Sequence, residues 1–301
     1  MIWLILVSLL WAFSFSLIGH VLNGVDANFV ALVRLAISLL VFLPLMRTRR
    51  LGRRQLLALL GVGALQFGVM YVAYINAYGY LKPAEIALFT VFTPLYCTLI
   101  NDLLRKRLHV VFLLTTLLAV AGAAVLKWVE LDSSGLWMGF GLMQLSNICF
   151  AFGQIGYKKI MGDDPKLKNT QVFGLLYMGG AAVAGLWAGA TVDWMQVSLT
   201  SQQWLTLIYL GAIASGVGFF LWNYGATKVN AGSLAIMNNL KIPLAVGVAV
   251  LVVPEKQFDD PLNFVVGGSM ILAALALNEW AARKLRRRQA SPKASLANES
   301  D

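Results

Sequence analysis

The sequence has few charged residues and few reactive side chains. Charged residues make up 13% of its 301 residues, whereas 59% are apolar or aromatic. A chain this apolar has too little polar surface for a soluble enzyme, a nucleic-acid-binding protein or a secreted domain, which excludes these classes. Its 2 cysteines, Cys97 and Cys149, lie in apolar runs, and its 2 histidines are far apart. The sequence therefore predicts no disulfide framework, no metal site and no cofactor.

Apolar runs long enough to span a bilayer are the main feature of the sequence. A helix needs about 20 apolar residues to cross the hydrocarbon core. The first run lacks a preceding basic segment and a following cleavage site, so it is predicted to be a retained helix and not a signal peptide. The predicted fold class is an all-α polytopic membrane protein with ten transmembrane helices, at Ile2–His20, Phe29–Met46, Gln55–Ala77, Ala84–Leu103, Val110–Leu126, Leu136–Tyr157, Thr170–Ala190, Trp204–Tyr224, Gly232–Val253 and Leu262–Ala281.

The 24 lysines and arginines lie mainly in the connectors between these runs. With the amino terminus in the cytoplasm, 19 of them fall in cytoplasmic segments and 3 in external ones. This distribution follows the positive-inside rule, and it predicts a multi-pass protein of the bacterial inner (plasma) membrane with both termini cytoplasmic. The net charge of +10 is thus a topology signal, and no nucleic-acid partner is expected.

The two halves of the chain resemble each other. A shift of 149 residues places Pro94 on Pro243 and Lys106 on Glu255. Five helices per half is an odd number, so the second half enters the membrane from the opposite side. Such inverted repeats are typical of secondary transporters, whose substrate site lies near the midplane. The predicted units are a first five-helix repeat at 1–128, an inverted second repeat at 129–282 and a basic, disordered cytoplasmic tail at 283–301.

Several short motifs resemble those of the EamA-type transporters of the drug/metabolite transporter superfamily. They are Trp11–Phe15, Arg34, Pro94–Leu95 before a basic turn, and Pro243–Leu244 with Pro254 and Glu255. The resemblance covers about residues 1–281. It implies a ten-helix basket of two inverted repeats that moves small metabolites, such as amino acids and their derivatives, usually outward. Lys106 departs from the pattern, because the family often has glutamate there, and this difference indicates that the position serves the turn.

Lys241 is the first candidate for substrate binding. A charge inside the membrane costs roughly 2.5–3.5 kcal/mol, so it needs a partner or an aqueous cavity. Lys241 lies nine residues into its predicted helix, too deep for its side chain to reach the interface fully, and Asn238 lies one turn earlier. Together they offer an ammonium and an amide to a carboxylate. A structural lysine, neutralised by burial or paired with a helix acid, is the alternative of equal weight.

Arg34 and Glu85 are the other candidate charges within the predicted helices. Arg34 lies near the external end of its helix, where it could bind an anion, but a structural or gating role through backbone carbonyls is favoured. Glu85 lies in the first turn of its helix, a position that the helix dipole favours for an acid. It also heads a face with Phe89, Phe92 and Tyr96, at spacings of 4, 3 and 4, which could meet a substrate amine or a proton.

Further polar and aromatic residues recur at helical spacing. Gln144, Asn147 and Gln154 form a polar seam that lines the pathway or joins helices, two interpretations of equal weight. Trp11 lies in the middle of its helix and is a candidate lining residue. Two other patterns predict helix packing: the aromatic stripe of Phe67, Tyr71, Tyr74 and Tyr78, and the small-residue pairs of Gly185 with Gly189 and Gly211 with Ser215.

The sequence as a whole predicts a secondary transporter that works by alternating access and exports small amino-acid-like or amine-bearing metabolites. No H-E-x-x-H, G-x-S-x-G or Walker motif occurs, so neither an enzyme nor a directly ATP-driven pump is expected. The alternatives are an importer of such metabolites, a broad-specificity drug exporter and a channel. The expected partners are the small-molecule substrate, membrane lipid and protons as a coupling ion, and both a monomer and a homodimer are left open.

Overall fold

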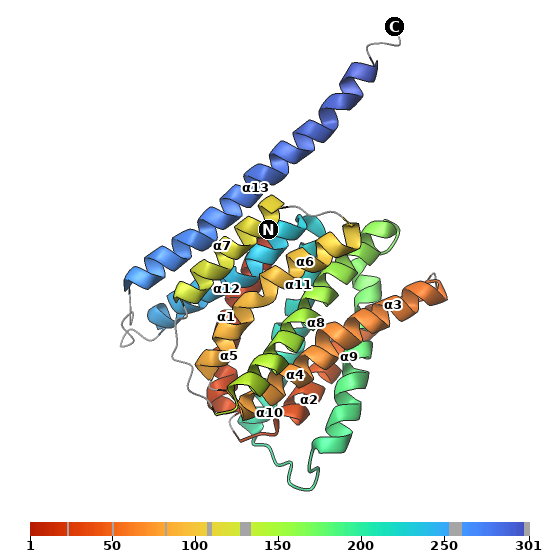
Figure 1. Cartoon of the computed structure of the whole chain (residues 1–301). Helices are drawn as coiled ribbons and strands as arrows, with labels where there is room; N and C mark the ends of the chain where they lie inside the picture. The colour runs from red at the N-terminus through yellow and green to blue at the C-terminus, as the bar shows by residue number, and fades with distance from the viewer. Residues whose placement is uncertain are drawn as a thin grey trace.

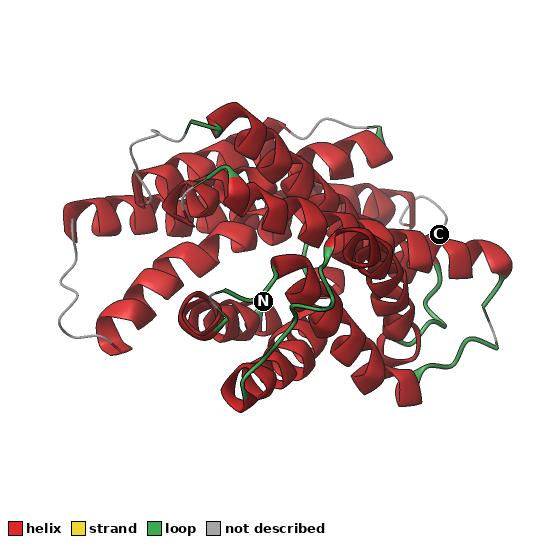
Figure 2. Cartoon of the chain, turned by 90° about the horizontal axis from the view of Figure 1, so that it is seen from below, coloured by secondary structure: helices red, strands yellow, loops and turns green. Residues whose placement is uncertain are grey.

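The computed structural model is a bundle of long helices joined by short connectors (Figure 1). It describes residues 1–22, 24–49, 51–81, 83–106, 110–126, 134–252 and 261–297. Within these ranges the backbone alone is described for residues 12–20, 83–84, 87, 126, 241–243, 245–252, 261, 264 and 285–297. Every regular element in the described ranges is a helix, as Figure 2 shows.

Ten helical rods follow one another along the described residues, so the predicted fold class is confirmed. Six rods are single α-helices: α1 (Ile2–Val21), α7 (Val110–Leu126), α8 (Leu136–Asp163), α9 (Asn169–Thr191), α12 (Ala231–Val252) and α13 (Pro261–Ala297). The other four rods change helix type along their length. Two of them contain a 3-10 turn: α2 (Ala27–Phe42) ends in one at Leu43–Leu45, and α5 (Pro83–Phe89) continues through one at Thr90–Phe92 into α6 (Thr93–Arg105). Two contain a π-helical segment: α3 (Arg53–Gly63) continues through η2 (Ala64–Val69) into α4 (Met70–Asn76) and a 3-10 turn at Ala77–Gly79, and α10 (Ser201–Tyr209) continues through η5 (Leu210–Val217) into α11 (Gly218–Lys228).

Helix length and composition fit a membrane environment. Among the described residues, six helical rods are long and apolar enough to cross a bilayer. Large apolar side chains such as Trp137 and Leu186 are exposed on the outside of the bundle, at 82% and 79% of their surface. In water such exposure would be unfavourable, whereas in a bilayer these side chains face lipid. The six rods are Ala27–Leu45, Arg53–Gly79, Leu136–Asp163, Asn169–Thr191, Ser201–Lys228 and Val265–Lys284.

Local sequence explains where several helices begin and end. Asp26 caps α2, because its Oδ1 accepts a hydrogen bond from the backbone N–H of Phe29 at 2.9 Å. Thr200 and Gln203 form a reciprocal capping box at the start of α10. Helix α6 ends where Lys106 adopts a left-handed conformation with φ of 51°, which agrees with the prediction that this position serves the turn.

Helix α13 continues to Ala297, well beyond the predicted end of its membrane span. The sequence predicted a disordered tail from residue 283, and the structure differs there. Alanine, arginine and lysine, which are common after residue 281, are strong helix formers, and basic residues suit the carboxyl end of a helix. In Figure 1 this part of α13 extends past the rest of the bundle.

The two halves of the chain pack against each other along most of their length. Helix α1 contacts α11 and α12, α2 contacts α9 and η5, and α7 contacts α13. Helices α3 and α9 approach each other closely. A Cβ atom at Gly63 would lie 2.0 Å from the carbonyl oxygen of Leu176, and one at Gly179 would lie 2.1 Å from that of Leu60. Only glycine allows two helix backbones to come this close.

The predicted small-residue contacts are right in one case and wrong in another. A Cβ atom at Gly211 would lie 2.7 Å from the Cβ of Ile37 on α2, which confirms a close contact there. At Gly189 no atom lies within 4 Å of that position, so a packing role is wrong. The reason is that α3 meets α9 near Gly179, nearly three turns before Gly189.

Connectors gather at the two ends of the bundle, as an alternating topology requires. The backbone N–H of Arg47 donates to the carbonyl oxygen of Gln171 at 3.0 Å, so the α2–α3 and α8–α9 connectors lie side by side. At the other end of α2 and α9, a common cavity is lined by Gly24–Asp26, Asp193 and Gln196–Leu199.

The charge distribution predicts which end is cytoplasmic. We expect reporter fusions after Asp26, Asp193 and Asp260 to report the external side, because the basic connectors lie at the opposite membrane face. Asp260 lies outside the described residues. Alkaline phosphatase and green fluorescent protein fusions at the three positions measure this directly, and a cytoplasmic signal at any two would overturn the orientation.

Candidate substrate-binding site

Four buried amide side chains from four different elements form two hydrogen-bonded pairs in the interior. Gln66 of η2, Gln154 of α8, Asn223 of α11 and Asn238 of α12 are called the amide cluster here. Gln154 and Asn238 exchange two hydrogen bonds of 3.2 and 3.1 Å, and Gln66 Nε2 donates to Asn223 Oδ1 at 3.2 Å. All four side chains are at most 1% exposed. Burying an amide group is unfavourable unless it is hydrogen-bonded, so these bonds stabilise the interior. The bond between Gln66 and Asn223 also links the two halves of the chain.

Gln66 brings an unused acceptor into this cluster. Its Oε1 atom is buried and has no hydrogen-bond partner among the described residues. The side chain packs on Gly153, the neighbour of Gln154, where a Cβ atom would lie 2.2 Å from the Cβ of Gln66. A buried carbonyl oxygen without a partner is unfavourable by about 1–3 kcal/mol, so it is suited to accept a hydrogen bond from a ligand N–H group.

Arg34 lies between α2 and the second π-helical segment. Its Nη2 and Nε atoms donate to Ser215 Oγ at 2.8 and 3.1 Å. Its guanidinium carbon lies 5.4 Å from the centre of the Tyr71 ring, a cation–π contact. The hydroxyl of Tyr177 donates to the carbonyl oxygen of Ser215 at 2.9 Å. These contacts hold α2, α4, α9 and η5 together, and they favour the structural role predicted for Arg34.

A row of aromatic rings connects the surroundings of this guanidinium to the amide cluster. Trp11, Trp222, Phe219 and Tyr71 are called the aromatic row here. The Trp11 ring lies 5.2 Å from Trp222 and 5.1 Å from Phe219, and Phe219 lies 6.1 Å from Tyr71. Trp222 Nε1 donates to Gln154 Oε1 at 3.0 Å. The row thus runs from the amide cluster, which Trp222 contacts, to Arg34, which Tyr71 contacts.

The structure brings some of the predicted site residues together. Trp11, Gln154 and Asn238 all belong to the amide cluster or the aromatic row. The side chain of Lys241 lies outside the described residues, although the backbone of α12 places this position one turn after Asn238. Trp11 Nε1 also donates to the carbonyl oxygen of Ala214 in η5 at 2.9 Å, which ties α1 to the second half.

The face of Phe89, Phe92 and Tyr96 predicted on α5 and α6 packs against α8. The Phe92 ring lies 6.2 Å from Phe140, and the Tyr96 hydroxyl donates to Gln144 Oε1 at 3.0 Å. Glu85 is buried in the first turn of α5. Phe92 packs into apolar clusters separate from the one that holds the aromatic row.

Asn147 stabilises the break between α5 and α6. Its Nδ2 donates to the carbonyl oxygen of Phe89 at 2.7 Å, and its Oδ1 accepts a hydrogen bond from Thr93 at 3.0 Å. These two partners flank the 3-10 turn Thr90–Phe92. Of the two interpretations of the polar seam, helix joining is favoured for Asn147. Gln144 is half-buried, and its Nε2 atom has no hydrogen-bond partner among the described residues.

The sequence analysis missed several residues of this site. Gln66 and Asn223 are single polar residues within apolar runs, and neither belongs to a set of polar residues that recurs at helical spacing. The internal repeat held a usable signal, because the shift of 149 residues places Gln66 on Ser215, and both lie in π-helical segments. Polar residues at equivalent positions of the two halves point to the interface between them.

Comparison with known proteins places the chain in a family. The sequence profile of the EamA-like transporter family matches residues 1–128 and again residues 137–280. The chain belongs to this family. One crystal structure superimposes on the EamA fold of this chain with a TM-score of 0.75 at 18% sequence identity, covering 94% of this chain and 98% of that one, and this match bears on the fold alone.

Similar EamA-family proteins carry more specific names. The chain is 42% identical over 283 residues to the biotin transporters of Salmonella typhimurium (strain LT2) and Escherichia coli (strain K12), an overlap of 93% of this chain and 92% of each relative. It is 39% identical over 287 residues to a probable biotin transporter of Pseudomonas aeruginosa, covering 94% of this chain and 99% of that protein.

These findings confirm the family, the duplicated ten-helix fold and a transport function. The chain is a multi-pass membrane transporter of a small molecule and not an enzyme. The predicted export of amino-acid-like metabolites finds no support among these relatives, which are named biotin transporters. The reason for the difference is that intramembrane charges indicate an ionic substrate without specifying the rest of its structure.

Proposed function

We propose that this protein transports biotin across the membrane in the direction of uptake. The observation that carries the proposal is the identity of 42% over 93% of the chain to proteins named biotin transporters. Such identity over nearly the full length includes the helices that supply the amide cluster and the aromatic row.

The chemistry of the interior supports the same ligand. Biotin has a ureido ring with N–H donors and a carbonyl acceptor, an apolar fused ring and a carboxylate on an alkyl chain. The unused Oε1 of Gln66 is a suitable acceptor for a ureido N–H, and the rings of Trp11 and Trp222 suit the fused rings. Biotin has no amine, so Glu85 has no substrate amine to bind, and protons stay its candidate ligand.

Transport by purified protein in proteoliposomes tests this proposal. We expect saturable entry of radiolabelled biotin that excess unlabelled biotin and desthiobiotin compete for, because desthiobiotin keeps the ureido ring and the carboxylate. Amino acids should not compete. Entry with and without an imposed pH gradient shows whether protons are coupled, and loading biotin inside the vesicles tests the opposite direction. Absence of biotin entry by folded protein, or competition by amino acids, would contradict the proposal.

A variant of Gln66 links the result to the site. Gln66→Leu should lower biotin affinity by about two- to tenfold, since it removes a hydrogen bond worth roughly 0.5–1.5 kcal/mol. Thr98→Val is the matched control, because Thr98 is also buried and bonded across helices, to Thr116 of α7 at 2.8 Å. Equal losses in both variants would show that general destabilisation, and not ligand contact, causes the effect.

A further inference from the structure

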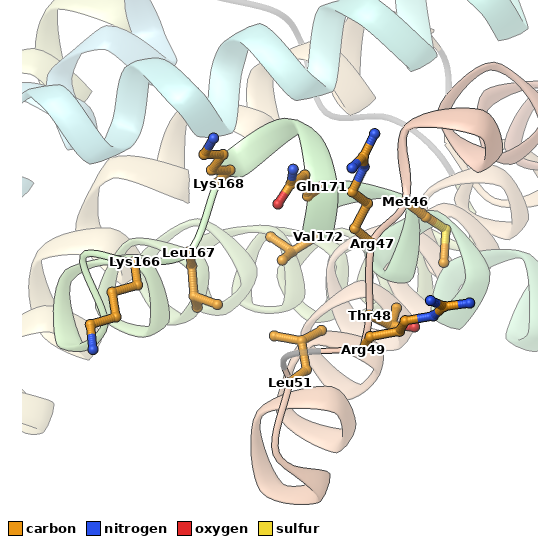
Figure 3. Close-up of a pocket in the computed structure, with 10 residues that line it drawn as sticks. All are labelled: Met46, Arg47, Thr48, Arg49, Leu51, Lys166, Leu167, Lys168, Gln171 and Val172. Atoms are coloured by element: carbon orange, nitrogen blue, oxygen red, sulfur yellow. The ribbon is translucent and has the colours of Figure 1, made fainter.

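A basic cavity lies where the α2–α3 and α8–α9 connectors meet. Its volume is about 620 Å³. Figure 3 shows Arg47 and Lys168 pointing to the same side of the cavity, with the Gln171 amide between them. The cavity, called the basic pocket here, is lined by Met46, Arg47, Thr48, Arg49, Leu51, Lys166, Leu167, Lys168, Gln171 and Val172.

A backbone hydrogen bond holds the two connectors of the basic pocket together, and the cations of the pocket are available to bind an anion. The N–H of Arg47 donates a hydrogen bond of 3.0 Å to the carbonyl oxygen of Gln171, and this bond joins the two connectors. None of the four lining cations pairs with an acid in the part of the chain that the structure describes, where the ion pair found joins Lys159 to Asp163. The nearby Asp164 accepts hydrogen bonds from Gln55 and from a backbone N–H instead.

The charge of this pocket contrasts with that of the cavity at the opposite end of the same helices. That second cavity, of about 410 Å³, is lined by Asp26, Asp193 and neutral residues, with no lysine or arginine. The two ends therefore differ in the sign of their charge. The basic pocket also contains the first turn of α9, whose N–H groups and dipole favour an anion.

Apolar surface next to the pocket distinguishes a lipid from a free anion. Leu40, Leu43 and Leu45, which precede the pocket along α2, expose 64%, 49% and 47% of their surface. Within the pocket, Met46, Leu51 and Leu167 add apolar lining. A ligand with an anionic head and alkyl chains would bury both surfaces, whereas inorganic phosphate would use only the cations.

We propose that the basic pocket binds the headgroup of an anionic phospholipid, with its acyl chains along the exposed leucines. Basic side chains near a membrane surface attract anionic lipid by about 1 kcal/mol each, and arginine pairs well with phosphate oxygens. The site lies at the end predicted to be cytoplasmic and is independent of the substrate that the transporter carries.

Lipid titration of purified protein in neutral detergent tests this inference. Dioleoylphosphatidylglycerol is the probe, and native mass spectrometry and the unfolding temperature are the measurements. Arg47→Gln with Lys168→Gln should weaken binding about 30-fold, which is ~2 kcal/mol at 1.4 kcal/mol per factor of ten. Arg53→Gln with Arg54→Gln is the control, because it removes the same charge from exposed residues of the same segment that do not line the pocket.

The comparison of probes separates the possible outcomes. We expect the wild-type protein to bind phosphatidylglycerol more tightly than phosphatidylcholine, and the control pair to bind it as the wild-type protein does. Equal weakening in both double variants would show diffuse surface attraction and overturn the pocket. Inorganic phosphate that binds as tightly as the lipid, with the same loss in the pocket variant, would overturn the assignment to a lipid.

Discussion

Gly63→Ala should prevent the protein from reaching a stable fold. The added methyl group would lie 2.0 Å from the carbonyl oxygen of Leu176, and the nearest atoms belong to the α9 backbone, which cannot rotate away as a side chain can. Overpacking of a tight interface costs about 1–3 kcal/mol and more where backbone must move, so a loss of about 3 kcal/mol or more is expected. The unfolding temperature in detergent and the monodisperse yield from the membrane measure this effect.

Gly61→Ala provides the control for that experiment. Gly61 lies on the same helix two residues earlier, and a Cβ atom there would meet nothing within 4 Å. Alanine favours a helix more than glycine does, so Gly61→Ala should leave stability unchanged or raise it slightly. If Gly63→Ala behaved like Gly61→Ala, then α3 and α9 would not be in the close contact that the structure shows.

Lys241→Met should weaken biotin binding by ~1.5–3 kcal/mol, the scale of a hydrogen bond to a charged group, which is roughly tenfold to 100-fold. The position lies one turn after Asn238, whose amide is in the amide cluster, so a ligand that reaches the cluster can place its carboxylate nearby. Biotin amide lacks the carboxylate and should lose far less between the two proteins. Equilibrium binding of radiolabelled biotin, with the amide as competitor, measures both affinities.

Arg34→Met is the comparison for Lys241→Met. Because Arg34 bonds to Ser215 and lies against Tyr71, its replacement should lower the unfolding temperature and weaken acid and amide equally. Equal losses for acid and amide in Lys241→Met would give Lys241 a structural role. No loss in Lys241→Met, with a loss selective for the acid in Arg34→Met, would instead make Arg34 the carboxylate-binding residue.

The positions of the membrane helices follow from the sequence, because runs of apolar residues bounded by charge have one stable arrangement in lipid. Val110–Leu126 was predicted with the ends that α7 has, and α9 differs from its prediction by one residue at each end. The changes of helix type were not predictable in this way. The break between α5 and α6 depends on Asn147 of another helix, which bonds to the carbonyl oxygen of Phe89.

The aromatic stripe of α3 and α4 shows how a change of helix type alters a prediction that rests on helical periodicity. Spacings of 4, 3 and 4 place Phe67, Tyr71, Tyr74 and Tyr78 on one face of a regular helix, but η2 and a 3-10 turn interrupt this rod. Phe67 and Tyr71 are buried in the core, as predicted, whereas Tyr78 is 46% exposed and bonds to the hydroxyl of Tyr74 at 2.9 Å. The packing interpretation therefore holds for one end of the stripe.

The candidate site was predictable only in part, because its contacts depend on how the helices pack. Gln154 was predicted because it belongs to a polar seam at helical spacing, and Asn238 because it lies one turn before Lys241. Their mutual hydrogen bonds depend on how α8 and α12 pack, which the sequence does not specify. The internal repeat points to Gln66, but no sequence pattern reveals that its buried Oε1 has no hydrogen-bond partner among the described residues.

The two π-helical segments bear on the ancestry of the chain. Such a segment behaves as one residue inserted into an α-helix. Residues 64–69 shift onto 213–218, which overlap Leu210–Val217, so each half carries the insertion at an equivalent place. One insertion in the ancestral five-helix unit, copied when that unit was duplicated, explains both by a single event. The two copies share the irregular turn but differ in its polar contacts, because Gln66 bonds to Asn223 in one and Ser215 bonds to Arg34 in the other.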